Sequence, residues 1–163
     1  MKVKPVVTYR TTAQCPTHAR TEIPIRDLDV VVDEPVERGG TNLGPSPTET
    51  AMAALIACTN VIGHKNAHRF GIDLGTVTID AKCRLDRRGV LMEEEIDVPF
   101  PEIELTVKCD TPASQEELTR VGEETAKYCA IAKLFEAAGT DLTVNWVKQT
   151  NKDKRPDFLG GEK

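Results

Sequence analysis

One long helix, marked at both ends, is the strongest structural signal in this sequence. Ser46 and Glu49 have the spacing of a capping box, and Pro47 stands at the first helical position, where its missing N–H costs little. An apolar stripe at helical spacing follows, and Gly71 is a natural stop. About 24 residues at about 1.5 Å each span roughly 36 Å, enough to cross the domain. We therefore expect a central, buried helix over 47–70. The stripe consists of Ala51, Ala54, Leu55, Cys58, Val61 and Ile62.

Alternation of apolar and polar residues predicts strands on both sides of this helix. The predicted strands span 3–9, 19–25, 28–32, 77–85, 103–109 and 142–146. Before the last of them, Ser114 and Glu117 form a second capping box, which begins a helical region that ends at Gly139 and breaks near Gly122. This order of elements indicates an α+β domain with antiparallel strands around a long central helix.

Length and composition restrict the classes of function. A chain of 163 residues predicts one domain, which we place at 1–150, followed by a charged, disordered tail at 151–163. Lys+Arg 21 against Asp+Glu 26 gives a net charge of -5, which argues against a nucleic-acid partner. The longest uncharged run, 50–64, is too short to span a membrane, and no apolar leader follows Met1. We expect a cytoplasmic protein.

Two further patterns do not reach the specificity of a cofactor or metal site. The Gly-rich loop at 39–47 lacks the Gly-Lys-Ser/Thr ending of a phosphate loop. His64 and His68 have the i, i+4 spacing of metal ligands, but Lys65 replaces the glutamate of a zinc-protease motif. Their face of the helix is about 240° from Cys58. We predict a solvated helix end, no cofactor and no metal, and keep a cysteine–histidine metal protein as a minor alternative.

The five cysteines are an odd number without a C-x-x-C pair, which argues against a disulfide scaffold. Cys83 and Cys109 fall on the apolar faces of their strands, and we expect them in the core. Cys15 lies in a loop and has no predicted role. Cys58 and Cys129 both belong to predicted helices, and they are the candidates for chemistry.

The surroundings of these two cysteines resemble a known family. The segment 39–49, followed by 53–59, is similar to the central motif of the OsmC/Ohr family, and 128–134 is similar to its second cysteine box. The resemblance extends to about Trp146. It is closer to the general OsmC-like branch than to the hydroperoxide-resistance branch, where a glutamate takes the place of Thr48.

The resemblance implies an intertwined homodimer with the two long helices at its centre and active sites at the subunit interface. It also implies a peroxidase that acts on organic hydroperoxides or peroxide in oxidative-stress defence. Cys58 would be the attacking thiolate and become a sulfenic acid, Cys129 would form a disulfide with it, and an external dithiol would restore both. The alternative is a non-peroxidase OsmC-like dimer with packed cysteines, which binds a small molecule or has a structural role.

Two further site residues follow from the same resemblance. Arg20 is the choice for the cation that activates Cys58, because it lies on the polar side of its strand; Arg26 and Arg10 are alternatives. Glu49 precedes Cys58 by nine positions, which places it on the opposite helix face about 13 Å away, so it caps its helix or acts across the dimer. The proline that usually follows the second cysteine is replaced by Ala130.

Overall fold

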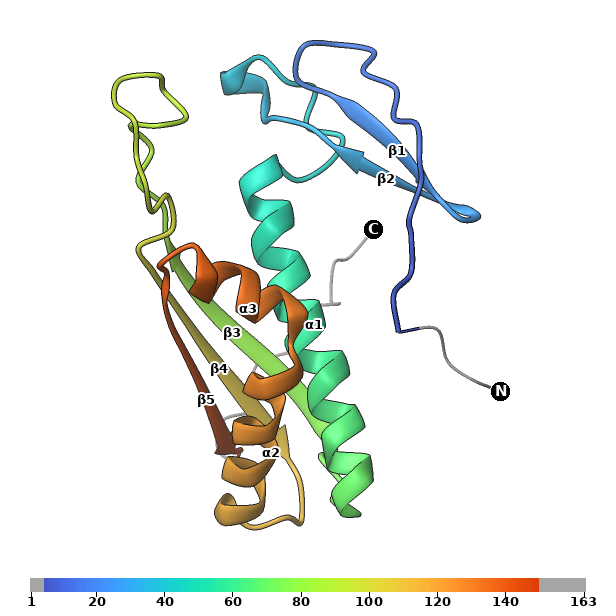
Figure 1. The fold of residues 1–163 in the computed structure, drawn as a ribbon, viewed down its shortest axis with the longest axis vertical. Helices are drawn as coiled ribbons and strands as arrows, with labels where there is room; N and C mark the ends of the chain where they lie inside the picture. The colour runs from blue at the N-terminus through green and yellow to red at the C-terminus, as the bar shows by residue number, and fades with distance from the viewer. Residues whose placement is uncertain (1–4, 150–163) are drawn as a thin grey trace, which may run out of the picture. The chain divides into compact units, whose positions relative to one another are not determined.

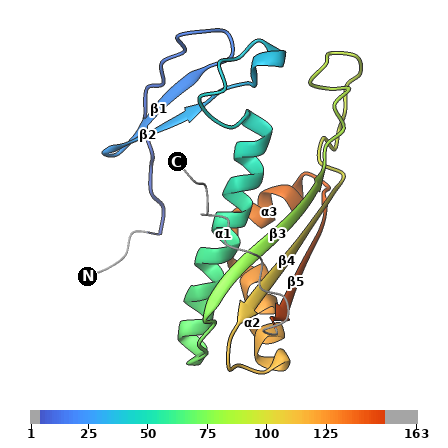
Figure 2. The ribbon, with the colours of Figure 1, turned by 180° about the vertical axis from the view of Figure 1, so that it is seen from behind.

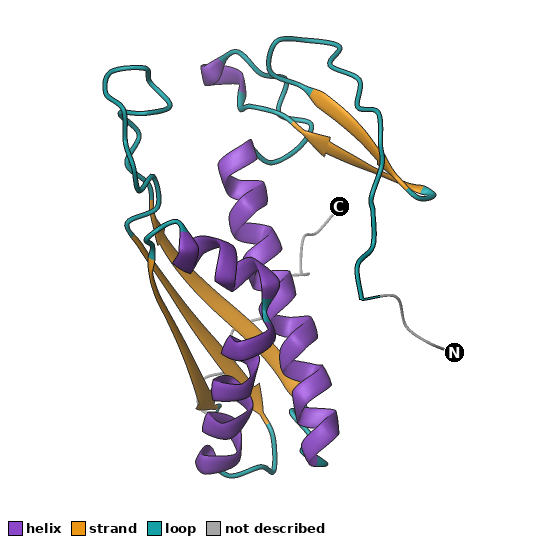
Figure 3. Cartoon of the chain, viewed as in Figure 1, coloured by secondary structure: helices purple, strands orange, loops and turns teal. Residues whose placement is uncertain are grey.

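The computed structural model describes residues 5–149, and the chain divides into two compact units after Ala53 (Figures 1 and 3). The first unit contains the strands β1 (Thr21–Ile25) and β2 (Leu28–Val32) and the short helix η1 (Val36–Arg38). The helix α1 (Pro47–Phe70) begins in this unit and continues through the second. The predicted tail at 151–163 lies outside the described residues, and the single-domain expectation stays a prediction.

The first unit is built on a β-hairpin. β1 and β2 pair antiparallel from Thr21–Val32 to Ile25–Leu28, with Arg26 in a left-handed conformation (φ 61°) at the turn. The strand predicted over 3–9 is wrong as far as it is described, because residues 5–10 form no strand and most of their side chains are exposed. Alternation gives a strand only where backbone groups find a partner, and within the described residues only Gln14 pairs here, with Glu22.

The second unit contains a three-stranded sheet in the order β3 (Thr76–Arg84), β4 (Glu102–Asp110) and β5 (Asp141–Lys148). β3 and β4 pair antiparallel, as expected, but β5 runs parallel to β4. The reason is the connection between them, since a helical segment of this length returns the chain to its starting end of the sheet. One sheet face packs against the helices, and the polar opposite face is seen from behind in Figure 2.

The helical connection consists of α2 (Gln115–Tyr128) and α3 (Ala130–Ala137). The Ser114–Glu117 capping box at its start is confirmed. The expected break near Gly122 is wrong, because the helix continues through Gly122 and ends at Cys129, whose ψ of 105° is extended. The break therefore falls on one of the two candidate cysteines.

Helix α1 has the predicted bounds but not the predicted burial. Its buried residues are Leu55, Thr59, Gly63, Asn66 and Ala67, a face of mostly small and polar side chains. Ala54 and Val61 of the predicted stripe are exposed in the chain by itself. The prediction of a buried helix is therefore correct for one side of α1 and wrong for the other side in the single chain.

Candidate functional site

Cys129 occupies the junction between α2 and α3. Its backbone N–H donates to the carbonyl of Thr125 at 2.9 Å and closes the last turn of α2. Its Sγ caps α3 by accepting a hydrogen bond from the N–H of Ala132 at 3.5 Å. A sulfur in this position meets the positive end of the helix dipole, which favours a thiolate when one forms.

The second unit brings Cys129 and Cys58 together. Cys58 lies half-buried in the middle of α1, close enough to Cys129 to raise the pKa of its thiol. Burial raises the pKa of the Cys129 thiol, and the nearby Cys58 raises it further, while the N–H of Ala132 acts in the opposite direction. Cys129 is therefore a neutral thiol near pH 7, and its S–H can donate to the sulfur of Cys58.

A buried polar link fixes α2 against α1 close to this pair. Asn66 Nδ2 donates to Thr125 Oγ1 at 3.4 Å, and Thr125 Oγ1 donates to the carbonyl of Val121 at 2.7 Å. Since the carbonyl of Thr125 also receives the N–H of Cys129, the link runs from α1 to the second cysteine. Sequence reasoning missed both residues, although a polar side chain on the buried face of a helix is a usable signal.

A cavity of about 690 Å³ lies against Cys129. Its polar lining includes Thr59 of α1 and Thr125 of α2, and its apolar lining includes Ala132 of α3 and Trp146 of β5. Cys58 is not among the residues that line it. The size is that of a small-molecule pocket.

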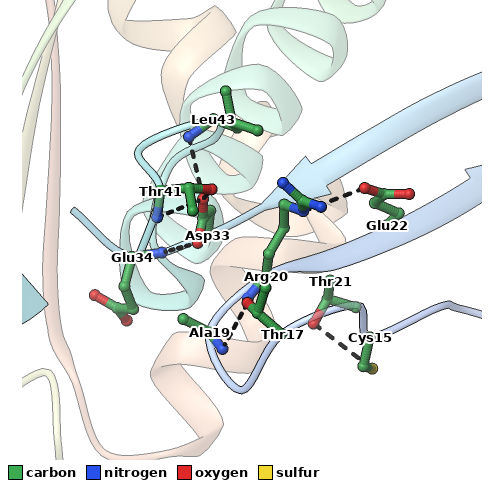
Figure 4. Close-up of polar contacts among 10 residues, drawn as sticks. All are labelled: Cys15, Thr17, Ala19, Arg20, Thr21, Glu22, Asp33, Glu34, Thr41 and Leu43. Atoms are coloured by element: carbon green, nitrogen blue, oxygen red, sulfur yellow. Dashed lines mark hydrogen bonds and ion pairs between the residues drawn. The ribbon is translucent and has the colours of Figure 1, made fainter. Parts of the chain in front are cut away.

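Arg20 and Glu49 belong to the first unit, whereas Cys58 and Cys129 belong to the second. The Nε of Arg20 lies 3.2 Å from Glu22 Oε1 in an ion pair that lacks hydrogen-bond geometry (Figure 4). A role for Arg20 beside Cys58 stays a prediction, and so do the alternatives Arg26 and Arg10.

Glu49 closes the capping box predicted for α1. Its Oε2 accepts hydrogen bonds from the N–H of Ser46 at 2.7 Å and from Ser46 Oγ at 2.8 Å, and Ser46 Oγ accepts from the N–H of Glu49 at 3.4 Å. The bonds from Ser46 lower the pKa of Glu49, and the positive charge of Arg38 contributes. The carboxylate therefore caps the helix, and a catalytic role for it stays a prediction.

The Gly-rich loop is organised by Asp33, a residue that sequence reasoning missed. The fully buried carboxylate accepts hydrogen bonds from the N–H groups of Glu34, Thr41 and Leu43 and from Thr41 Oγ1 (Figure 4). These bonds, that from the Thr41 side chain above all, lower the pKa of Asp33 to about 2. A Cβ on Gly40 would lie 1.7 Å from the carbonyl oxygen of Glu34, so glycine is required by close packing. N–H groups of the loop thus donate hydrogen bonds to the carboxylate of Asp33.

The two histidines of α1 are exposed, and His64 Nδ1 lies 3.0 Å from the carbonyl oxygen of Asn60. Among residues 5–149 no group of three or more His, Cys, Asp or Glu side chains is arranged to hold a metal ion. In the same part of the chain no helix is long and apolar enough to cross a membrane.

The sequence from 40 to 145, well over half of the chain, matches the family model described as OsmC-like protein. The chain belongs to the OsmC-like family. The resemblance of the two cysteine segments is thereby confirmed. Among curated proteins, nothing matches the chain.

Solved structures of this family have the same fold. An OsmC-like protein from Mycoplasma pneumoniae is 16% identical with a TM-score of 0.72, over 87% of this chain and 97% of that one. A protein from Legionella pneumophila, titled an organic hydroperoxide resistance protein OsmC, is 17% identical with a TM-score of 0.64, over 86% and 98%. The organic hydroperoxide resistance protein OhrB of Bacillus subtilis is 18% identical with a TM-score of 0.60, over 86% and 98%. The α+β, OsmC-like fold is confirmed by these likenesses.

Proposed function

We propose that this OsmC-like protein is a thiol-dependent peroxidase that reduces organic hydroperoxides, or peroxide itself, in oxidative-stress defence. The observation that carries the proposal is the closeness of the thiols of Cys58 on α1 and Cys129 at the junction of α2 and α3. The names of the Legionella and Bacillus structures support the substrate class. Since all five cysteines are free thiols, we also propose that the protein works in the reducing cytoplasm.

In the proposed cycle, the thiolate of Cys58 attacks the outer oxygen of the hydroperoxide. The O–O bond breaks, the alkoxide takes a proton from water and leaves as the alcohol, and Cys58 becomes a sulfenic acid. Cys129 loses its proton and attacks the sulfenic sulfur, so that water leaves and a Cys58–Cys129 disulfide forms. The N–H of Ala132 at Cys129 Sγ offsets part of the cost of forming that buried thiolate. A dithiol then supplies the two electrons that restore both thiols.

We propose further that the working form is a homodimer and that Arg20 activates Cys58 there, with Glu49 positioning the arginine. The exposed apolar side of α1, which includes Ala54 and Val61, supports a helix–helix contact between subunits. Sedimentation should give twice the chain mass. Arg20→Ala should slow the alkylation of Cys58 at pH 7, whereas Arg10→Ala should not.

The test of the main proposal is consumption of cumene hydroperoxide in the presence of dithiothreitol. We expect Cys58→Ser to be inactive and Cys129→Ser to oxidise once and then turn over slowly, because its sulfenic acid has no partner. Cys83→Ser is the matched control and should keep full activity. Activity in Cys58→Ser equal to that of the unchanged protein would refute the proposal.

The alternative is a small-molecule-binding member of the family without peroxidase activity. Two observations favour it: Arg20 pairs with Glu22, and Glu49 is engaged by Ser46, so both candidate helpers of Cys58 have local partners. Inactivity of the fully reduced protein, together with alkylation of Cys58 only at alkaline pH, would support this alternative.

A further inference from the structure

The cavity beside Cys129 is lined by this residue and not by Cys58. Three of its lining residues, Cys129, Thr59 and Thr125, are buried. Its lining also contains two acidic residues, Glu123 of α2 and Glu136 of α3. Cys58 lies close to Cys129 and yet does not line the cavity. Cys129 thus borders both the cavity and Cys58.

A thiol can reduce a disulfide only if it reaches one of the two sulfurs from the side opposite the other sulfur. The attacking thiolate forms a mixed disulfide with one sulfur and expels the other, and it approaches along the S–S axis from the far side. In the oxidised protein, attack on Cys129 expels Cys58, and attack on Cys58 expels Cys129. Burial raises the pKa of Cys129, which makes Cys129 a poor leaving group. Access and leaving group therefore favour attack on Cys129.

We propose that this cavity admits the thiol reductant, which attacks Cys129 Sγ of the oxidised pair and expels Cys58 as a thiolate. The inference rests on the proposed function and adds the route and direction of the reductive half-reaction. The reductant's first thiolate bonds to Cys129 Sγ while the Cys58–Cys129 bond breaks. Its second thiolate then attacks the reductant's own bonded sulfur, closes the reductant's disulfide and expels Cys129, which takes up a proton. Two electrons pass from dithiol to protein.

The lining of the cavity defines the class of reductant. Cys129 is only 1% exposed, so a slender alkyl thiol reaches it more readily than a bulky one. Glu123 and Glu136 place negative charge on the route, which disfavours anionic thiols and favours neutral or cationic ones. The cavity therefore fits a narrow, neutral or cationic dithiol.

The site of attack is tested on protein oxidised with diamide, so that no peroxide chemistry is needed. The disulfide form is mixed with 2-mercaptoethanol, quenched with acid within milliseconds, and analysed by mass spectrometry after the free thiols are blocked. We expect the mercaptoethanol adduct on Cys129 and a blocked Cys58. An adduct on Cys58 overturns the inference. Failure to consume cumene hydroperoxide, measured separately, would refute the proposed function and leave this adduct assignment unaffected.

The route is tested by the charge of the thiol. Reduction rates of the diamide-oxidised protein are compared for cysteamine and 2-mercaptoethanesulfonate, which are of similar size and opposite charge. In Glu123→Lys, the rate with cysteamine divided by the rate with 2-mercaptoethanesulfonate should fall about threefold to tenfold, because a positive charge replaces a negative one in the cavity lining. Glu93→Lys makes the same change of charge on the exposed loop between β3 and β4, outside the cavity lining, and should leave the ratio unchanged. Equal ratios in the two variants would overturn the proposed route.

Discussion

Trp146 of β5 fills the space in which a side chain at Gly63 of α1 would stand. A Cβ on Gly63 would lie 2.3 Å from Cη2 of the indole, closer than any real contact. The same ring lies against α2, where a Cβ on Gly122 would be 2.6 Å from Cδ1. Trp146 is 6% exposed and belongs to the core, so the ring has little room to move. Two glycines on different helices thus allow both helices to pack against one indole.

We therefore expect Gly63→Ala and Gly122→Ala each to destabilise the second unit. Overpacking costs about 1–3 kcal/mol, which exceeds the gain of about 1 kcal/mol that alanine brings to a helix interior. The chain has one tryptophan, so urea unfolding followed by its fluorescence reports on this contact directly. Gly89→Ala, whose nearest neighbouring atom is 3.5 Å away, is the control. A higher unfolding midpoint in Gly63→Ala would contradict the packing argument.

The thiol pair makes a prediction about the pH at which Cys129 reacts. Burial and the nearby Cys58 both raise its pKa, and only the second cause disappears in Cys58→Ala. The pH midpoint of Cys129 alkylation by iodoacetamide, followed by mass spectrometry, should move to lower pH in Cys58→Ala. It should remain above the value of a free thiol, because the burial persists. Cys83→Ala should leave the midpoint in place, and an equal shift there would argue against coupling within the pair.

The parts of the fold that local signals determine could be predicted from the sequence. The Ser46–Glu49 box and Pro47 determine where α1 begins, because they satisfy its first N–H groups by themselves. Alternation located β3 and β4, and these strands form because each is the other's partner. The strand expected before residue 10 failed because strand formation depends on a partner that a local pattern does not contain.

The parts that depend on tertiary packing could not be predicted. The break between α2 and α3 falls at Cys129, while Gly122, a weak helix former, stays helical where it meets Trp146. The buried face of α1 shares Leu55 with the predicted stripe but also contains Thr59 and Asn66, so hydrophobicity located this face only in part. The two cysteines were found through the resemblance. The link from Asn66 to Thr125 and the cavity depend on contacts between distant segments.

Asp33 predicts an acid-sensitive Gly-rich loop in the first unit. Its pKa is lowered from 3.8 to about 2, so its contribution to stability is present above about pH 4 and is lost as the pH falls toward 2. Asp33→Asn should be less stable than the unchanged protein at pH 7, because the amide group would present N–H donors to N–H groups. NMR of the Thr41 and Leu43 amides during urea titration measures the difference. It should shrink between pH 4 and pH 2, and Asp29→Asn on the exposed hairpin should show little effect.

Cys109 predicts a loss of stability in alkali. It is fully buried on β4, and burial raises the pKa of its thiol from 9.0 to about 11. A folded-state pKa above the unfolded value stabilises the protein below about pH 9, and this contribution is lost as the pH rises toward 11. The shift corresponds to about 3 kcal/mol.

Cys109→Ala should be less stable at pH 7 because it leaves a cavity, but its free energy of unfolding should fall less steeply above pH 9. Urea titrations in a phosphine reductant measure both curves, with the exposed Cys15→Ala as the control that keeps the steep fall. Parallel curves for Cys109→Ala and the unchanged protein would show that ionisation of Cys109 does not limit stability in alkali.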